Sequence, residues 1–419
     1  MSKSEHKINS FQLTATHFLN ELKAVFGDKG ALLILIGAMI IYPVIYSIGY
    51  FNETMNNLSV GVVDLDHSAA SRKYESMIDA SAELNVTCKP ENLALAEALF
   101  MDNKINGVVL IPKGFQEDLL LGKQAQVAIY ADAGYFLKYK NTVMAVTVSN
   151  AWFSGGVAVK HYLAEGKSLQ QAKIAADPLA AQTHILYNPS AAYGSFVMPG
   201  MILIIIQQTL LIGIGVLGGS FSESKDSPFL LSGQQRKRDV IPLLMGKTGA
   251  YLLISLLNIA FAVVMVHHWF NYPDKASMLH ILMLLFPYIL SVIFLGIGLS
   301  TLFKHRESSM VFMVFLSPVA LFLSGLSWPV SAIPDWLVTL SKLMPSTTAV
   351  PAYLRLRNMG VGIAEVKDEM IFMYAQAAVY FMLTLSYFLI RISVDKRRNK
   401  VEVEIEENNE IIIKGTPSF

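Results

Sequence analysis

Six stretches of this chain contain no Asp, Glu, Lys or Arg over the length of about 20 residues that a helix needs to cross a bilayer. Only 16% of the residues are charged, but six such stretches together are not a matter of chance. The sequence therefore predicts an α-helical polytopic membrane protein with six spans. These are expected at Ala31–Phe51, Phe196–Gly219, Thr248–Phe270, Met278–Phe303, Met310–Val330 and Ile371–Ile390.

Composition excludes several other classes of protein. Hydrophobic residues make up 53% of the chain, and the net charge of +1 offers no basic surface for a nucleic acid. The single cysteine, Cys88, allows neither an intrachain disulfide nor a zinc site built from several thiolates. It lies in a strand-like stretch, and we expect a half-buried packing residue.

Lysine and arginine cluster in the segments that cytoplasmic loops would occupy. They precede the first expected span, separate the second from the third and the fourth from the fifth, and follow the sixth. By the positive-inside rule both termini are cytoplasmic. The expected organisation is a cytoplasmic amphipathic helix (1–30), span one (31–51), an external α/β domain (52–194), spans two to six (195–392) and a cytoplasmic tail (393–419).

The inserted external domain shows alternating strand and helix signals. Runs rich in Val and Ile predict strands at Leu58–Val63, Asn106–Ile111 and Gln126–Tyr130, and the stretch Leu84–Lys89 is strand-like. Apolar periodicity predicts helices at Ala69–Ala80 and Asn92–Asp102, and a long one near Tyr135–Leu163 that Gly155-Gly156 interrupts. The stretch Asp64–Ser68 could belong to a metal site, but a helix cap by Asp66 or Ser68 is favoured, since a metal needs three or more converging ligands.

Several catalytic and nucleotide-binding motifs are incomplete or missing. Gly246-Lys247-Thr248 resembles the end of a phosphate-binding loop, but Ile241 stands where that loop needs a glycine. The pair His267-His268 beside Trp269 is interpreted as part of an interfacial belt. No carboxylate lies within an expected span, which argues against an ion-coupled pump and for energy from another subunit.

Local patterns along most of the chain agree with one known plan: one span, a large external domain, then five spans. The stretches Val60–Ser68 and Ile105–Phe115 are similar to the start and middle of that family's external domain. The most specific sign is a series after the fifth span: Ser324-Gly325, Trp328-Pro329, Pro334 and Pro345-Ser346-Thr347. On these grounds the chain resembles the permease subunit of type-2 ABC exporters, in the bacterial multidrug-type subfamily, over about residues 20–395.

The resemblance implies partners and an activity. It implies a dimer of identical or paralogous permeases in the inner membrane, in contact with membrane lipids. Two cytoplasmic ABC ATPase subunits would hold ATP and Mg, with no cofactor on this chain, and a periplasmic membrane-fusion protein is a further implied partner. The complex would move amphipathic or hydrophobic compounds outward. The rival hypotheses are a receptor or scaffold that binds through its external domain, and an intramembrane enzyme.

Coupling to an ATPase is expected in two cytoplasmic segments. One is the amphipathic stretch Phe11–Phe26, which could equally be a membrane-surface helix. The other is the loop 220–247, whose residues depart from the usual family pattern. The basic run Arg236–Arg238 there could instead set topology and contact anionic lipid. The candidate coupling residues are Glu223, Lys225, Gln234, Gln235, Arg236, Lys237, Arg238 and Asp239.

Polar side chains inside apolar spans are the candidates for a substrate pathway. An amide within a span must face protein or water, so each is either pathway or helix–helix contact. The candidates are Gln207, Gln208, Asn258, Ser324 and Trp328. The family uses the segment 329–369 as an external re-entrant hairpin, which puts Arg355 and Arg357 at the interface or facing the external domain.

The tail after Lys400 alternates as a strand does at Val401–Glu406, and Glu410–Lys414 could pair with it. A small hairpin or an unordered tail are the two alternatives, because an isolated hairpin is marginal in water.

Overall fold

The computed structural model describes residues 9–51, 56–179, 181, 184–188, 192–223 and 237–414, the stretch 395–414 by its helical backbone alone. The chain forms two compact units. The first unit combines residues 1–51 with 187–419, and the second comprises 52–186. The predicted fold class is a helical membrane protein with an α/β domain inserted between its first and second spans. The structure confirms it.

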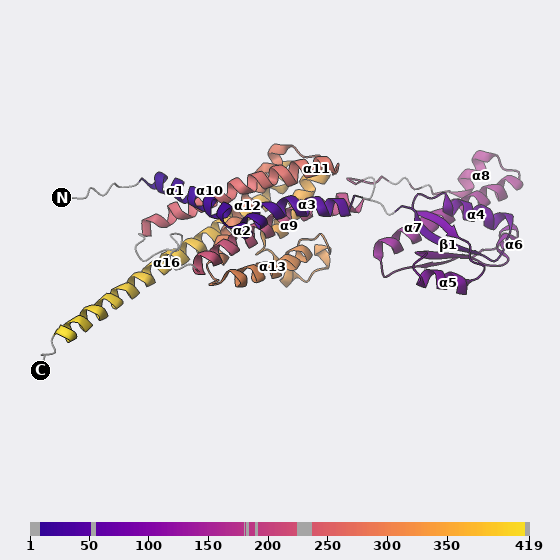
Figure 1. The fold of residues 1–419 in the computed structure, drawn as a ribbon. Helices are drawn as coiled ribbons and strands as arrows, with labels where there is room; N and C mark the ends of the chain where they lie inside the picture. Colours follow the sequence, from indigo (N-terminus) through magenta and orange to yellow (C-terminus); the bar gives the residue numbers. More distant parts are fainter. Residues whose placement is uncertain are drawn as a thin grey trace. The chain divides into compact units, whose positions relative to one another are not determined.

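The first unit is a bundle of long apolar helices (Figure 1). All six predicted spans are helical over most of their length, and several helices begin before the predicted limits, whereas α13 ends at Leu323, short of the predicted end at Val330. Span one comprises α2 (Lys29–Leu32), the π-helical η1 (Leu33–Gly37) and α3 (Ala38–Gly49); span two is α9 (Tyr193–Glu223); span three comprises α10 (Val240–Ile259), the π-helical η3 (Ala260–Met265) and α11 (Val266–Trp269); span four is α12 (Met278–Ser300); span five is α13 (Arg306–Leu323); span six lies in α16 (Lys367–Lys414).

Helix α9 is the central element of this unit, and most of its side chains are buried. Its glycines allow neighbours to approach closely. A Cβ at Gly213 would lie 2.4 Å from Leu35 of η1, and one at Gly215 would lie 2.5 Å from Ser309 of α13. A Cβ at Gly218 would lie 2.6 Å from Ser300 at the end of α12. Spans one, four and five therefore pack closely against the glycines of α9.

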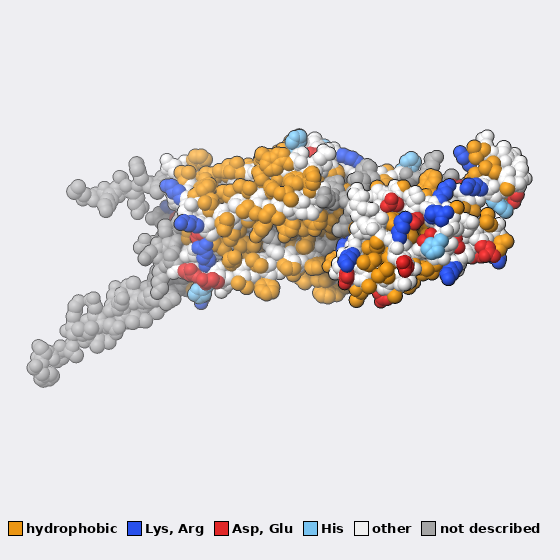
Figure 2. Space-filling view, turned by 45° about the vertical axis from the view of Figure 1, so that its right-hand side comes forward, with side chains coloured by type: hydrophobic (Ala, Val, Ile, Leu, Met, Phe, Trp, Pro, Cys, Tyr) orange, Lys and Arg blue, Asp and Glu red, His pale blue; other side chains and the backbone are white. Residues whose placement is uncertain are grey.

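Hydrophobic side chains form a continuous surface over this unit, and charged side chains gather mostly at one end of it (Figure 2). Helix α1 (Ser10–Gly27) lies at that end. A broad apolar belt on a helical bundle is what contact with lipid tails requires.

The segment between spans five and six folds back as short helices. These are η4 (Val330–Ala332), α14 (Asp335–Ser341), α15 (Pro345–Leu354), the π-helical η5 (Arg355–Met359) and η6 (Ile363–Val366). Helix α15 continues through Pro351 and widens into η5 one turn later. Residue Arg357 of η5 is 1% exposed and bonds within this unit, to Tyr353 and Asp274.

The second unit is built on a four-stranded sheet of order β2-β1-β3-β4. Strands β1 (Leu58–Asp64), β2 (Leu84–Cys88) and β3 (Gly107–Ile111) are parallel, and β4 (Ala128–Ala131) pairs antiparallel to β3. Alternate side chains point to opposite faces of a strand. Val60 and Val62 pack against α4 (Ala69–Asp79) and α7 (Phe136–Ala164), whereas Val63 packs towards α5 (Leu93–Met101). All four predicted strands are confirmed.

Helix α7 is a seventh helix long and apolar enough to cross a membrane, among the described residues. Its hydrophobicity has another explanation, because Val146 and Phe153 pack on the sheet. The helix continues through Gly155-Gly156, so the predicted interruption was wrong. The unit is completed by α6 (Phe115–Leu120) and α8 (Leu169–Ala176).

The acidic stretch after β1 is used for helix caps. The Ser68 hydroxyl accepts the backbone N–H of Ser71 at 3.1 Å, so Ser68 caps α4 as predicted. The Asp66 carboxylate accepts the backbone N–H groups of Gly114 and Gln116 at the start of α6. Asp64 accepts the Ser71 hydroxyl at 2.7 Å.

Helix α16 continues without interruption to Lys414, so both alternatives given for the tail, a hairpin and an unordered stretch, were wrong up to that residue. The stretch Lys367–Lys414 contains neither glycine nor proline, and Gly415 is the first residue able to end the helix easily. The alternation of apolar and charged residues over Val401–Glu406 is a weaker signal than this absence of helix-breaking residues.

Candidate functional site

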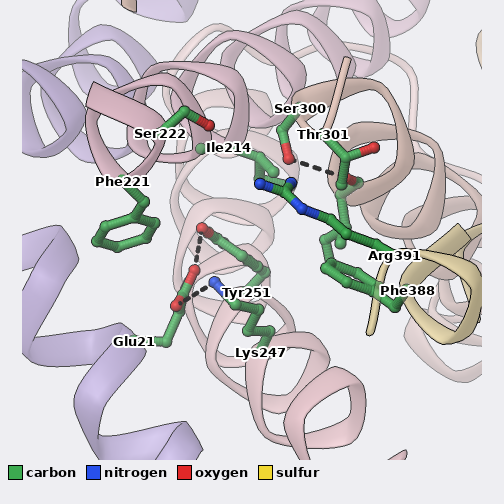
Figure 3. Close-up of a pocket in the computed structure, with 12 residues that line it drawn as sticks. Glu21, Ile214, Phe221, Ser222, Lys247, Tyr251, Ser300, Thr301, Phe388 and Arg391 are labelled. Carbon is green, nitrogen blue, oxygen red and sulfur yellow. Dashed lines mark hydrogen bonds and ion pairs between the residues drawn. The ribbon is translucent and has the colours of Figure 1, made fainter. Parts of the chain in front are cut away.

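A buried carboxylate on helix α1 bonds to two side chains of span three. Glu21 of α1 is 1% exposed, and the Lys247 ammonium of α10 lies 2.7 Å from its Oε2. The Tyr251 hydroxyl, one turn further along α10, donates to Oε1 at 2.5 Å. Figure 3 shows both side chains converging on the carboxylate. Breaking such a pair by removing one partner costs about 3–5 kcal/mol, because it leaves an uncompensated buried charge.

The same two helices approach backbone to backbone beside this pair. A Cβ at Gly246 would lie 2.6 Å from His17 Cβ, 2.7 Å from the Thr14 carbonyl and 2.9 Å from the Phe18 nitrogen. Only glycine therefore permits the observed packing of α1. Gly246-Lys247-Thr248 lies inside α10, where it serves this contact.

A second ion pair joins the start of span one to the start of span five. The Arg306 guanidinium donates to both Asp28 oxygens, at 2.7 and 2.9 Å. Asp28 also caps α2 by accepting the N–H groups of Gly30 and Ala31. Burial alone raises the pKa of Asp28, but the hydrogen bonds from Ala31 and Arg306 outweigh it, so that pKa lies below its usual value.

Arg306 also meets the last turn of α9. Its guanidinium donates to the Ser220 hydroxyl at 3.3 Å, and its backbone N–H donates to Glu223 at 2.9 Å. We call Glu21, Lys247, Tyr251, Asp28 and Arg306 the collar. The collar joins α1 and the start of span one to the two helices, α9 and α10, that flank the segment 224–236.

The predicted coupling residues fall into two groups. Glu223 ends α9 beside the collar, and Lys237, Arg238 and Asp239 form the 3-10 turn η2 that leads into α10. Lys225, Gln234, Gln235 and Arg236 lie outside the described residues. The structure thus describes only the two ends of the predicted coupling loop.

Four of the five predicted pathway residues have a local structural role or are exposed. The Gln207 amide donates to the Ser346 hydroxyl at 3.0 Å, and its oxygen accepts the Ser346 N–H at 2.8 Å. Asn258 donates to the carbonyl of Leu35 in η1 at 2.9 Å. The Ser324 hydroxyl donates to the Leu321 carbonyl at 2.7 Å, and Trp328 is 57% exposed.

Gln208 is different from its neighbour. It is 7% exposed, and within the described part of the chain neither its amide nitrogen nor its oxygen has a hydrogen-bond partner. A buried polar group left unpaired costs about 1–3 kcal/mol. Within a span, such an amide can bond to water, a ligand or another chain.

At the other end of the bundle, Arg357 links the 329–369 segment to the loop between spans three and four. Its guanidinium donates to the Asp274 carboxylate and to the Tyr353 hydroxyl, each at 2.7 Å. His267 packs edge-on against Tyr353 and is 2% exposed, so it does not belong to the predicted belt, whereas Trp269 is 54% exposed.

Sequence reasoning missed Glu21, Asp28 and Arg306. One signal was present for Glu21: it follows Phe18 by three residues and precedes Val25 by four, on the predicted apolar face of α1. Phe11 and Phe26, assigned to that face, are 77% and 56% exposed.

Comparison with known proteins identifies the family. The profile of the "ABC-2 family transporter protein" matches residues 29–386. The chain belongs to this family. It is the membrane component of an ABC-2 type transporter and a multi-pass membrane protein, and permeases of this family pair with ABC ATPase subunits, which use the ATP.

A curated relative is similar at lower identity. "ABC transporter G family member 20" of Dictyostelium discoideum is 23% identical over 352 residues. The match covers 81% of this chain and 44% of the relative. The chain therefore spans less than half the length of that protein.

Proposed function

We propose that this chain is the permease of an ATP-driven exporter. It moves amphipathic or hydrophobic compounds outward across a bacterial inner membrane, works as one half of a permease dimer, and is driven by separate ATPase subunits. The resemblance to multidrug-type exporters supports the direction and the class of compound. A periplasmic membrane-fusion protein is a further proposed partner.

The orientation of the proposal follows from charge. The helix ends near α1 carry most of the Lys and Arg residues that flank the spans, and such residues favour the cytoplasmic side. Under this orientation both termini, η2 and the collar are cytoplasmic, and the 52–194 insert and the 329–369 hairpin are external.

The collar is the observation that carries the mechanism. A cytoplasmic ATPase that pushes on the segment 220–247 moves the ends of α9 and α10. Because Arg306 links the end of α9 to Asp28, and Lys247 links α10 to Glu21, such a push also moves α1 and the starts of spans one and five. The ion pairs thereby make several spans respond as one body.

Gln208 is the residue we propose for the pathway. The other buried polar groups among the predicted candidates bond within the protein, whereas both polar atoms of Gln208 remain available. A single amide in an apolar wall suits compounds that are mostly hydrophobic with one or two polar groups.

The experiment that tests this function is purification of the full chain from its host in mild detergent, with identification of proteins retained in near-stoichiometric amount. Co-purification of an ABC ATPase supports the proposal, and a second permease beside it would make the dimer heteromeric. Absence of an ATPase after crosslinking through the 220–247 loop would contradict it and favour a receptor or scaffold.

A further inference from the structure

Three residues of the collar, Glu21, Lys247 and Tyr251, line one side of a cavity of about 50 Å³ that opens to the surface of the bundle. Its lining comes from α1, α9, α10, α12 and α16, and the side chains are shown in Figure 3. A single water needs about 10–15 Å³, so this space holds a few waters or one small polar group, and it is too small for a whole amphipathic compound.

The cavity contains one cation beyond what its own acid neutralises. Two cations, Lys247 and Arg391, face one carboxylate, Glu21. Glu21 is already paired with Lys247 and accepts the Tyr251 hydroxyl. Arg391 extends from α16 across the cavity towards Ser300 (Figure 3). Within the described residues its guanidinium makes no ion pair or hydrogen bond.

A half-buried guanidinium with free N–H groups is suited to an oxyanion. Its planar fork matches two oxygens of a phosphate or carboxylate, and partial burial strengthens the attraction. The hydroxyls of Ser300 and Thr301 donate to backbone carbonyls, so Arg391 is the main donor on that side. The aromatic ring of Phe388 and the side chain of Ile297 complete an apolar rim.

The surroundings favour a lipid as the source of that oxyanion. The same helices α10 and α12 carry an apolar groove of about 140 Å³, lined by Leu252, Leu256, Ile259, Leu282, Leu285, Phe286 and Ile289 among others. We propose that this cavity binds the phosphate headgroup of an anionic membrane lipid, with Arg391 as its ligand. The site is separate from the proposed export pathway at Gln208 and does not depend on the direction of transport.

Native mass spectrometry of the full chain in detergent tests the proposal. The protein is titrated with dioleoylphosphatidylglycerol, with dioleoylphosphatidylcholine and with inorganic phosphate. We expect one tight phosphatidylglycerol per chain, weaker phosphatidylcholine, and little displacement by phosphate. Loss of a charge-assisted bidentate contact in Arg391→Gln should weaken the first phosphatidylglycerol by about tenfold or more.

The matched control is Lys304→Gln, which removes the same charge from an exposed position at the same end of the bundle. A second variant, Ser222→Phe, keeps Arg391 but narrows the cavity that Ser222 lines, so it should also weaken binding. It tests the site even where Arg391→Gln fails to fold.

Three results would overturn the proposal. The first is unchanged phosphatidylglycerol affinity in both cavity variants. The second is an equal loss in Lys304→Gln, which would indicate general charge attraction. The third is full displacement by inorganic phosphate, which would make a free anion the ligand.

Discussion

At the scale of single residues, Gln207 and Gln208 are adjacent, chemically identical and differently used. Replacing Gln207 by Leu leaves the N–H and hydroxyl of Ser346 without their partner, so we expect a loss of about 1–3 kcal/mol in the free energy of unfolding. Gln208→Leu removes an already unpaired amide and should leave thermal stability in detergent equal or higher. Export of compounds with polar groups should fall. Equal destabilisation by both variants would show that Gln208 has a partner within the protein.

The Asp28–Arg306 pair carries a pH dependence. Because the folded-state pKa of Asp28 lies below the usual 3.8, its contribution to stability is present above that pH and is lost as the pH falls through the folded value. Asp28→Asn should therefore be less stable than the wild type by about 1 kcal/mol at neutral pH, since the pair is partly exposed. Thermal unfolding of both proteins across pH should show this difference shrink below 3.8. A difference that persists unchanged in acid would contradict the assignment.

The residue types showed which polar side chains are unusual within a span, but not which of them have a hydrogen-bond partner in the fold. The sequence singles out both glutamines equally, because the partner of Gln207 lies 139 positions away at Ser346. Glu21 was overlooked for the same reason: its partners Lys247 and Tyr251 are more than 220 residues further along the chain. Long-range pairs of this kind depend on tertiary packing, which a single sequence does not display.

At the scale of elements, the contact between α1 and α10 depends on a missing side chain. Gly246→Ala places a methyl group against the backbone of α1, so α1 must move and the Glu21–Lys247 pair should weaken. We expect a loss of about 1–3 kcal/mol in the free energy of unfolding. Gly249→Ala is the matched control, because a Cβ there would meet only the flexible ring of Phe18 at 3.2 Å. The two variants should differ clearly in thermal midpoint, and equal midpoints would contradict the close approach.

Elements with strong periodicity were predictable, and their ends and exceptions were not. Charge-free length located all six spans, and Val-rich alternation located the strands of the α/β unit. The prediction for the tail was wrong because the alternation over Val401–Glu406 is also compatible with a helix that contains no glycine or proline. Helix α7 shows the converse, since its apolar residues pack on a sheet.

At the scale of the whole molecule, the contacts of the collar link several spans of the membrane unit. The family assignment establishes a transporter membrane component, but the chain spans less than half of the matched relative. The ion pairs and hydrogen bonds of the collar link spans one, two, three and five. We propose that this linkage, and not the binding of an ATPase alone, converts ATP hydrolysis into export.

The most direct test is the number of molecules exported per ATP hydrolysed in proteoliposomes that contain this chain and its ATPase. Glu21→Gln keeps the shape of the side chain but removes the charge that holds Lys247. We expect that the ATPase still binds and hydrolyses ATP while export per ATP falls by about fivefold or more. The control Glu307→Gln, at an exposed position of the same end, should behave as the wild type. Unchanged export per ATP in Glu21→Gln would show that the Glu21–Lys247 pair does not transmit the movement of the ATPase to the spans.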